Sequence, residues 1–362
     1  MASTAARDAW ISEKIGSLLE AASEPHLTAL SADVRTNLEH LFETRVQGYR
    51  EILLTVLVAM LRYPEYRSSE ALYDCNPRPI YEKGLRPVLD RAGIPCSQSC
   101  VLNIAKATPA LDASWAAQRS GVEALDVLRL VAHIEQSEDN VELCALALVY
   151  RFKQSAAEIV DLRTPWSSQV DLGTLVNLCI ELVLQAPDGG NTPQRICGLL
   201  LKRYHHLSPL EVYGVTDSAS TTNLTSNKPG DLSVVEPSGG LHSVYEVTVK
   251  RFDAQRISEC TKSLRSFEKK YGKQVSNVRV LCRQADAPDH ATFSGQPVGL
   301  FLGATTDQGL AYEFLDIFSW IAALLFSLSD EQRVEFSSEL QDYVDHHNTS
   351  TTVKRVYKAL VD

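Results

Sequence analysis

The sequence predicts a mixed α/β (α+β) fold: a mixed central sheet flanked by helices, a large, mostly helical N-terminal region and a helical C-terminus. Apolar residues recur at spacings of three and four through most of residues 8–150, which is typical of amphipathic helices. Between residues 231 and 302, short apolar or alternating segments are bounded by turn-forming residues, as strands are. From Glu313 onward the pattern is helical again. The expected parts of the chain are residues 1–190, 191–305 and 306–362.

In the N-terminal region, one irregular stretch interrupts a series of helices. The helices are expected over residues 9–22, 27–61 with breaks, 122–134, 141–152 and 172–184. The irregular stretch, residues 73–119, contains repeated prolines. Because proline ends or kinks a helix, this stretch is expected to form loops and short helices packed at angles.

The middle part of the chain alternates helix and strand. Thr192 as N-cap and Pro193 in the first turn predict a helix that runs to about His206. A long loop rich in Ser, Thr and Asn follows over residues 216–230. The later elements are expected to be a strand at 231–235, a turn at 237–240, a strand at 241–250, a basic helix at 253–271, and short strands at 278–282 and 299–302.

Charge is distributed unevenly along the chain. The formal net charge is −10, which by itself argues against a nucleic-acid-binding protein. Residues 250–283, however, contain ten basic and three acidic residues, a local net charge of +7. This basic segment follows the strand at 241–250 and is either a solvated helix face or a surface suited to a polyanion.

Cysteine usage and hydropathy indicate the compartment. None of the eight cysteines belongs to a Cys-x-x-Cys pair, so a structural zinc site is not expected. Several lie in apolar patterns like buried free thiols, which fits a reducing environment. We find no signal peptide pattern and no apolar segment long enough to span a bilayer. We therefore expect a cytoplasmic protein without a membrane partner.

Polar residues on the predicted hairpin form a candidate site. Side chains alternate along a strand, so Glu246, Thr248 and Lys250 share one face of the strand. Asp231 opens the neighbouring strand directly after Pro-Gly, and a hairpin of this length brings it close to Glu246. Charged groups on a buried strand need an explanation, because unpaired buried charge is costly.

This set of residues fits the hydrolysis of a phosphodiester bond. Two clustered carboxylates, Asp231 and Glu246, offer the oxygen ligands that Mg²⁺ prefers. The metal lowers the pKa of a bound water and neutralises charge that develops on the phosphate. A lysine, here Lys250, can orient or deprotonate that water. We expect Asp231, Glu246 and Lys250 to be catalytic and the two carboxylates to be metal ligands.

Residues 229–250, Pro-Gly-Asp-Leu-Ser-Val-Val followed by Tyr-Glu-Val-Thr-Val-Lys, resemble the active-site segment of the PD-(D/E)xK nuclease superfamily. Within it, the chain looks most like the SacI-type restriction endonucleases. Those enzymes are similar in length, have a helical N-terminal half, and share a Pro-Gly-Asp strand and a Glu-Val-x-x-Lys strand. The resemblance covers residues 229–265, and elsewhere only length and layout.

The resemblance implies a sequence-specific type II restriction endonuclease of a bacterial cell, with a nuclease core at residues 191–305. Such an enzyme cuts double-stranded DNA with Mg²⁺, leaves 5′-phosphate ends and, for a palindromic site, acts as a homodimer. By position, Asp231 and Glu246 are its metal ligands and Lys250 its catalytic lysine. The sequence departs from the family at Thr248, which occupies the usual place of the lysine, two residues after the glutamate. Either a bulge or strong twist brings Lys250 closer, or Lys250 reaches inward from the strand end.

Further residues and functions remain open from the sequence. The candidates for DNA contacts are Arg78, Lys83, Arg86, Arg251 and Arg256. Ordinary loop charge explains the first three equally well, and Glu211 is a candidate for a further carboxylate. One alternative function is a non-catalytic DNA-binding protein on a degenerate nuclease fold, which predicts no dependence on divalent cations. Another is a defence nuclease that acts on modified or branched DNA.

Overall fold

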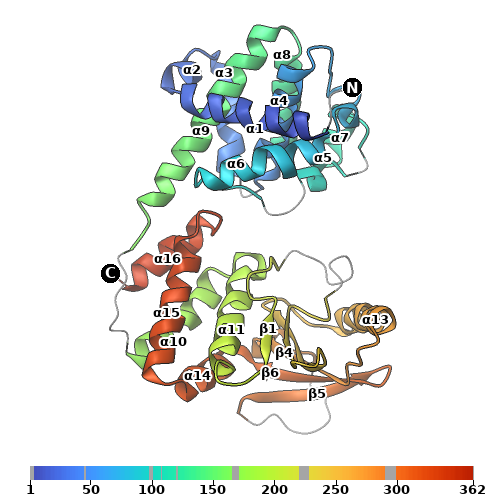
Figure 1. The fold of residues 1–362 in the computed structure, drawn as a ribbon, viewed down its shortest axis with the longest axis vertical. Coiled ribbons are helices and arrows are strands. Elements are labelled where there is room, and N and C mark those ends of the chain that lie inside the picture. The colour runs from blue at the N-terminus through green and yellow to red at the C-terminus, as the bar shows by residue number, and fades with distance from the viewer. Residues whose placement is uncertain are drawn as a thin grey trace. The chain divides into compact units, whose positions relative to one another are not determined.

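The computed structural model describes residues 4–44, 46–97, 101–106, 108–119, 121–164, 171–219, 228–289 and 299–361. The chain forms two compact units, Met1–Asp161 and Leu162–Asp362 (Figure 1). This boundary lies earlier than the sequence suggested, because the helix expected at 172–184 packs in the second unit, where Leu175 and Leu182 share a core with the sheet. None of the helices in these ranges combines the length and the apolar composition needed to cross a membrane.

The first unit is helical wherever the structure describes regular elements. Its α-helices are α1 (Thr4–Ala21), α2 (Glu24–Thr28), α3 (Ala32–Glu43), α4 (Gly48–Arg62), α5 (Pro77–Pro79), α6 (Arg86–Arg91), α7 (Ala113–Ala117), α8 (Glu123–Ile134) and α9 (Glu138–Val160). Short 3₁₀ segments η1 (Leu72–Cys75) and η3 (Val101–Ala105) and a π-helical turn η2 (Ile80–Leu85) complete it. The proline-rich stretch thus forms short helices, as predicted. Helix α4 is central, because every side chain of residues 49–60 is buried.

The second unit combines helices with strands. Its helices are α10 (Leu172–Gln185), α11 (Asn191–Tyr204), α13 (Ala254–Tyr271), α14 (Ile317–Ser327), α15 (Asp330–Asp345) and α16 (Thr351–Val361), with 3₁₀ turns η4 (Asp188–Gly190) and η5 (Gln284–Asp286). Its strands are β1 (Glu211–Tyr213), β2 (Leu232–Val235), β3 (Leu241–Thr248), β4 (Asn277–Cys282), β5 (Phe301–Asp307) and β6 (Leu310–Asp316). They form a six-stranded sheet in the order β1-β2-β3-β4-β6-β5. The sheet is mixed, as predicted, since β3, β4 and β6 run parallel and the other neighbours antiparallel.

Each face of this sheet has its own apolar core. Tyr245 and Val247 of β3 face a core shared with α10, α11 and α14. Val244 faces the other core, which includes Leu264 of α13 and Phe314 of β6. The helices therefore cover both faces, with α13 opposite to α10, α11 and α14 (Figure 1). The alternation predicted for β3 is confirmed, and it directs Glu246 toward the α13 side.

The C-terminal segment differs from the sequence-based expectation. Glu313, predicted to begin a helix, lies in strand β6 and pairs with Ala304 of β5. Buried residues alternate along β6, and α14 follows without a loop because Asp316 ends the strand and caps the helix. The apolar residues of β6 and α14 are therefore continuous in the sequence, and the strand was not predicted.

The start of α11 also differs from the prediction. The helix begins at Asn191, and its N-cap is Gly190, which has a positive φ of 110°. Thr192 is inside the first turn, where its buried hydroxyl lies 3.1 Å from the Tyr343 hydroxyl of α15. The threonine thus joins two helices rather than capping one.

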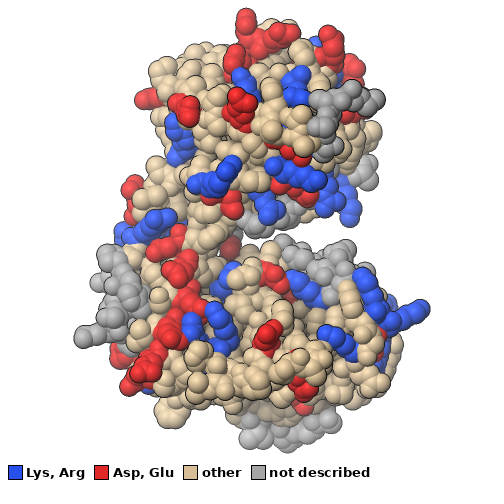
Figure 2. All heavy atoms as spheres, viewed as in Figure 1, with Lys and Arg blue, Asp and Glu red and all other residues tan. Residues whose placement is uncertain are grey.

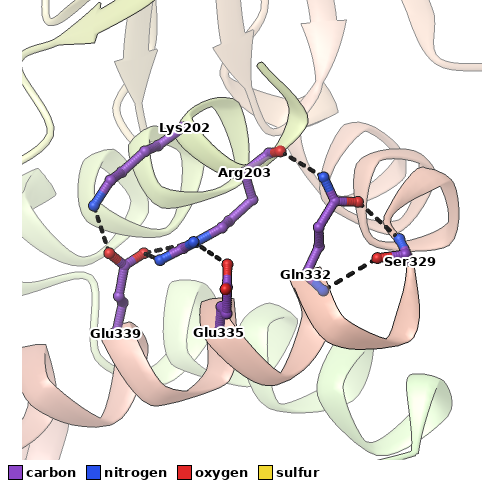
Figure 3. Close-up of polar contacts among 6 residues, drawn as sticks. All are labelled: Lys202, Arg203, Ser329, Gln332, Glu335 and Glu339. Atoms are coloured by element: carbon purple, nitrogen blue, oxygen red, sulfur yellow. Dashed lines mark hydrogen bonds and ion pairs between the residues drawn. The ribbon is translucent and has the colours of Figure 1, made fainter. Parts of the chain in front are cut away.

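Polar contacts hold α15 against α11 (Figure 3). The Arg203 guanidinium binds the Glu339 carboxylate through Nε at 3.0 Å and Nη2 at 2.8 Å, and also pairs with Glu335. The Gln332 amide donates to Arg203 O at 3.0 Å while its oxygen accepts from Ser329 N at 2.9 Å. These contacts join the C-terminal helix α15 to α11 within the second unit.

Candidate active site

The β2–β3 hairpin brings Asp231 and Glu246 together, as the sequence predicted. Leu232 pairs with Tyr245 in an antiparallel register, which sets the preceding Asp231 opposite Glu246. The N–H of Val247 donates to Asp231 Oδ2 at 2.9 Å and fixes that carboxylate at the strand edge. The two carboxyl groups are hydrogen-bonded to each other.

The backbone around Asp231 is closely packed, which explains the glycines near it. A Cβ atom on Gly230 would lie 2.7 Å from Val244 Cγ1 and 2.9 Å from Tyr245 O. Gly214 has a φ of 91°, and a Cβ there would lie 2.1 Å from Asp231 O. A third element was not predicted from the sequence: the buried amide of Gln194, on α11, donates to Gly214 O at 3.0 Å and Asp231 O at 3.4 Å. These contacts fix the main chain that carries Asp231.

The two carboxyl groups have different access to solvent. Glu246 is only 7% exposed, whereas Asp231 is half-buried. Burial and the adjacent Asp231 carboxyl raise the pKa of Glu246 well above its ordinary value. Burial also raises the pKa of Asp231, and the hydrogen bond from Val247 N opposes that rise. A positive ion bound between these groups would favour their ionised forms.

Lys250 and Thr248 lie in different surroundings. Lys250 was expected to be the catalytic lysine, and Thr248 occupies the usual position of that lysine in the sequence. Lys250 follows the end of β3 and is exposed. Thr248 is buried, and its hydroxyl accepts from Lys250 N at 3.1 Å and donates to Lys250 O at 3.0 Å. The same hydroxyl accepts from Arg256 Nη1 of α13 at 2.8 Å. Of the nearby charges, that of Arg256 has the largest lowering effect on the pKa of Asp231 and on that of Glu246.

A second side chain of α13 reaches the pair. The thiol of Cys260 donates to Glu246 Oε1 at 3.6 Å, and burial raises its pKa. Cys260 stands four residues after Arg256, so both lie on one face of the helix. That spacing was visible in the sequence, but only the packing of α13 on β3 shows that the face is turned toward Glu246.

The pair fits a hard divalent cation. Mg²⁺ keeps several of its waters and is commonly held by one or two carboxylates, which Asp231 and Glu246 provide. Within the described ranges, no cluster of three or more His, Cys, Asp or Glu residues forms a fuller site. Glu211, the candidate for a further carboxylate, is exposed on β1 opposite Val235 and bonds to the Tyr213 hydroxyl. It therefore lies toward the opposite end of β2 from Asp231.

The candidate DNA contacts divide between the two units. Arg78, Lys83 and Arg86 belong to the first unit. Arg78 pairs with Glu82 at 3.0 Å, Lys83 is exposed and Arg86 is half-buried. Arg251 is exposed in the second unit and pairs with Asp289 at 2.7 Å. Arg256 is thus the member of this set that the structure places beside the carboxyl pair.

A basic surface lies on the same unit as the pair. Figure 2 shows Lys and Arg side chains gathered over α13. Lys262, Lys269 and Lys270 of this helix are exposed, and Arg265 is half-buried. The positive surface therefore begins at the helix that also supplies Arg256 and Cys260.

Compared with known proteins, the sequence matches no family model and no curated protein. The nuclease resemblance accordingly rests on residues 229–265 and stays a prediction. What the structure adds is the geometry of the carboxyl pair and its neighbours.

Proposed function

We propose that the second unit is a Mg²⁺-dependent nuclease that hydrolyses phosphodiester bonds of double-stranded DNA. The observation that carries the proposal is the Asp231–Glu246 pair, which two neighbouring strands hold together on the α13 side of a mixed sheet. A buried carboxyl pair costs stability unless something compensates its charge, so its presence favours a cation-binding role over a purely structural one.

The chain's own residues would hold and orient the reacting groups. Asp231 and Glu246 would be the ligands of the Mg²⁺ ion. When bound, the ion supplies a water of lowered pKa and neutralises charge on the phosphate. Val247 N keeps Asp231 Oδ2 in place, and Gln194 fixes the main chain of Asp231. This support from two elements preserves the ligand geometry while substrate enters and leaves.

The substrate class follows from charge and resemblance. The basic surface over α13 supports binding of the phosphate backbone of DNA. Lys and Arg residues neutralise phosphate charges, and this contribution to binding does not depend on the base sequence. The resemblance to SacI-type enzymes adds site-specific cleavage, 5′-phosphate ends and a homodimer to the proposal. Arg78, Lys83, Arg86 and Arg251 remain candidates for contacts to the DNA.

One observation favours the non-catalytic alternative. Lys250, the lysine expected to assist the reaction, is exposed beyond the end of β3. A degenerate nuclease fold that only binds DNA would tolerate this arrangement. Such a protein would bind DNA equally well with or without divalent cations and would not cut it.

Cleavage assays distinguish the two functions. Phage and plasmid DNA are incubated with the protein in Mg²⁺ or in EDTA, and the products are separated by electrophoresis. We expect discrete fragments in Mg²⁺ only, and none from an Asp231→Asn variant. The matched control is Glu236→Gln, which alters an exposed carboxylate in the turn of the same hairpin and should leave cleavage unchanged. DNA that stays intact with the wild-type protein while binding persists would establish the alternative.

A further inference from the structure

Arg256 is the basic side chain that the hairpin site itself holds in place. It lies in the first turn of α13, where Asp253 caps the helix and accepts from Arg256 N at 3.0 Å. Its Nη1 donates to Thr248 Oγ1 at 2.8 Å and to Lys250 O at 3.4 Å. The guanidinium also packs 4.9 Å from the centre of the Phe252 ring. Helix, strand and ring together restrict the guanidinium to the C-terminal end of β3.

The positive charge of Arg256 acts on both members of the carboxyl pair. It lowers the pKa of Asp231 and that of Glu246, against the rise that burial causes. Lys228 also lowers the pKa of Asp231, but it forms an ion pair with Asp217.

We propose that Arg256, rather than Lys250, binds the phosphate beside the Asp231–Glu246 pair and stabilises the negative charge that develops there during cleavage. The inference rests on the proposed nuclease function and identifies the residue that receives the substrate's phosphate. A guanidinium offers five N–H donors in a planar arrangement that matches phosphate oxygens. Within the described residues, both side-chain hydrogen bonds of Arg256 use Nη1, which leaves the donors of Nε and Nη2 for a ligand.

The location of Arg256 separates two effects that are usually linked. A positive charge beside two carboxylates opposes the binding of a second positive ion, because like charges repel. The same charge attracts a phosphate. At a pH high enough to ionise both carboxyl groups, removing it should therefore strengthen the binding of a divalent cation and weaken the binding of DNA. A residue that merely supported the fold would weaken both.

The first measurement is the single-turnover cleavage rate of plasmid DNA in Mg²⁺. Arg256→Ala should lower the rate by about 10²–10³-fold, as the loss of one group that stabilises developing charge does. Arg256→Lys should recover part of this loss, and Lys250→Ala should change the rate by less than about threefold. The matched control is Arg355→Ala, an exposed arginine of α16, which should cut like wild type. A large loss in Lys250→Ala with normal cleavage by Arg256→Ala would overturn the inference.

The second measurement does not depend on cleavage. Mn²⁺ affinity is obtained from the shift in thermal unfolding temperature, and the affinity for a short DNA duplex is measured in Ca²⁺. Arg256→Ala should bind Mn²⁺ several-fold more tightly and the duplex more weakly than wild type. Unchanged affinities for both would overturn the inference, whatever the cleavage result. Failure of the wild-type protein to cut would instead refute the proposed nuclease, and the two affinities would still decide whether Arg256 binds phosphate.

Discussion

The two compact units each bury a carboxyl group near an arginine, and the surroundings of these groups differ. In the first unit, Glu51 of α4 is fully enclosed and accepts a hydrogen bond from Ser97 N. The neighbouring Arg50 is also buried, with its guanidinium 5.0 Å from the centre of the Phe42 ring. In the second unit, the carboxyl group is one of a pair, and the arginine beside the pair is half-buried.

Under the proposed function, this difference distinguishes a structural carboxyl group from a metal-binding pair. Burial raises the pKa of Glu51 to about 7, so this single carboxyl group can be protonated near neutral pH and needs no ligand. The Asp231–Glu246 pair holds two acidic groups in contact, one of them partly open to solvent. The second arrangement places two carboxyl groups together and leaves one of them, Asp231, partly exposed. A buried carboxyl group alone therefore does not mark a functional site.

The largest expected contrast is between Glu246→Gln and Glu51→Gln in the cleavage assay. Each substitution replaces a buried carboxyl group with an amide of the same shape. Glu246→Gln should lower the cleavage rate by about 10³-fold or more and abolish the stabilisation of the fold by Mn²⁺, because a ligand is lost. Glu51→Gln should cut and bind Mn²⁺ like wild type. Equal losses of cleavage rate in both variants would mean that the substitutions act by disturbing the fold and not by removing a metal ligand.

Truncation of Glu51 tests its structural role. Glu51→Ala removes the acceptor of the half-buried Ser97 N–H and opens a cavity inside the core around α4. We expect a loss of about 2–4 kcal/mol in the unfolding free energy of the first unit. Hydrogen exchange of the α4 amides measures this loss locally, and exchange of the β3 amides serves as the internal control. A loss of unfolding free energy no larger than that of a typical exposed substitution would show that Glu51 does not stabilise the first unit.

The pH dependence of the first unit should follow from the same group. The pKa of Glu51 is about 7 in the folded protein, above the ordinary glutamate value of 4.5, so the folded state holds this proton more tightly than the unfolded state. Stability should therefore fall as the pH rises from about 4.5 to 7, by about 3 kcal/mol, and stay low above that range. Exchange of the α4 amides at pH 5 and pH 8 measures the fall. Glu51→Gln cannot lose the proton, so it should not show this fall and should exceed wild type in stability at pH 8.

Features of the fold and the site that are determined within one segment of the chain could be predicted from the sequence. The hairpin, the facing of Glu246 and its proximity to Asp231 all follow from strand alternation within residues 231–250, and the structure agrees. The basic helix at 253–271 was likewise predicted almost to the residue. Strand β6 was missed because a helix follows it directly.

Contacts between distant segments were beyond the sequence. The role of Gln194 depends on α11 packing against the hairpin, and nothing in its local sequence indicates it. Arg256 was expected only as a DNA contact, because the packing of α13 on β3, which sets it beside Thr248, is a tertiary fact. Alternation put Thr248 and Lys250 on one face, but it did not show that β3 ends at Thr248 and leaves Lys250 exposed.

The smallest predicted effect concerns Thr248, whose buried hydroxyl accepts a hydrogen bond from the guanidinium of Arg256. Thr248→Val keeps the shape of the side chain but removes the oxygen that accepts from Arg256 Nη1, so cleavage should fall by about tenfold. Thr248→Ser keeps the hydroxyl and should stay within about twofold of wild type.

A double-mutant cycle between Thr248→Val and Arg256→Ala then separates positioning from general support of the fold. Once Arg256→Ala has removed the guanidinium, the Thr248 hydroxyl has only the Lys250 main chain left to hold, and the double variant should cut at the rate of Arg256→Ala alone. Two effects that multiply would show that Thr248 acts on the site independently of Arg256. In that case Glu51 and the Asp231–Glu246 pair would still differ in access to solvent. The role of the arginine beside each of them would no longer distinguish the two sites.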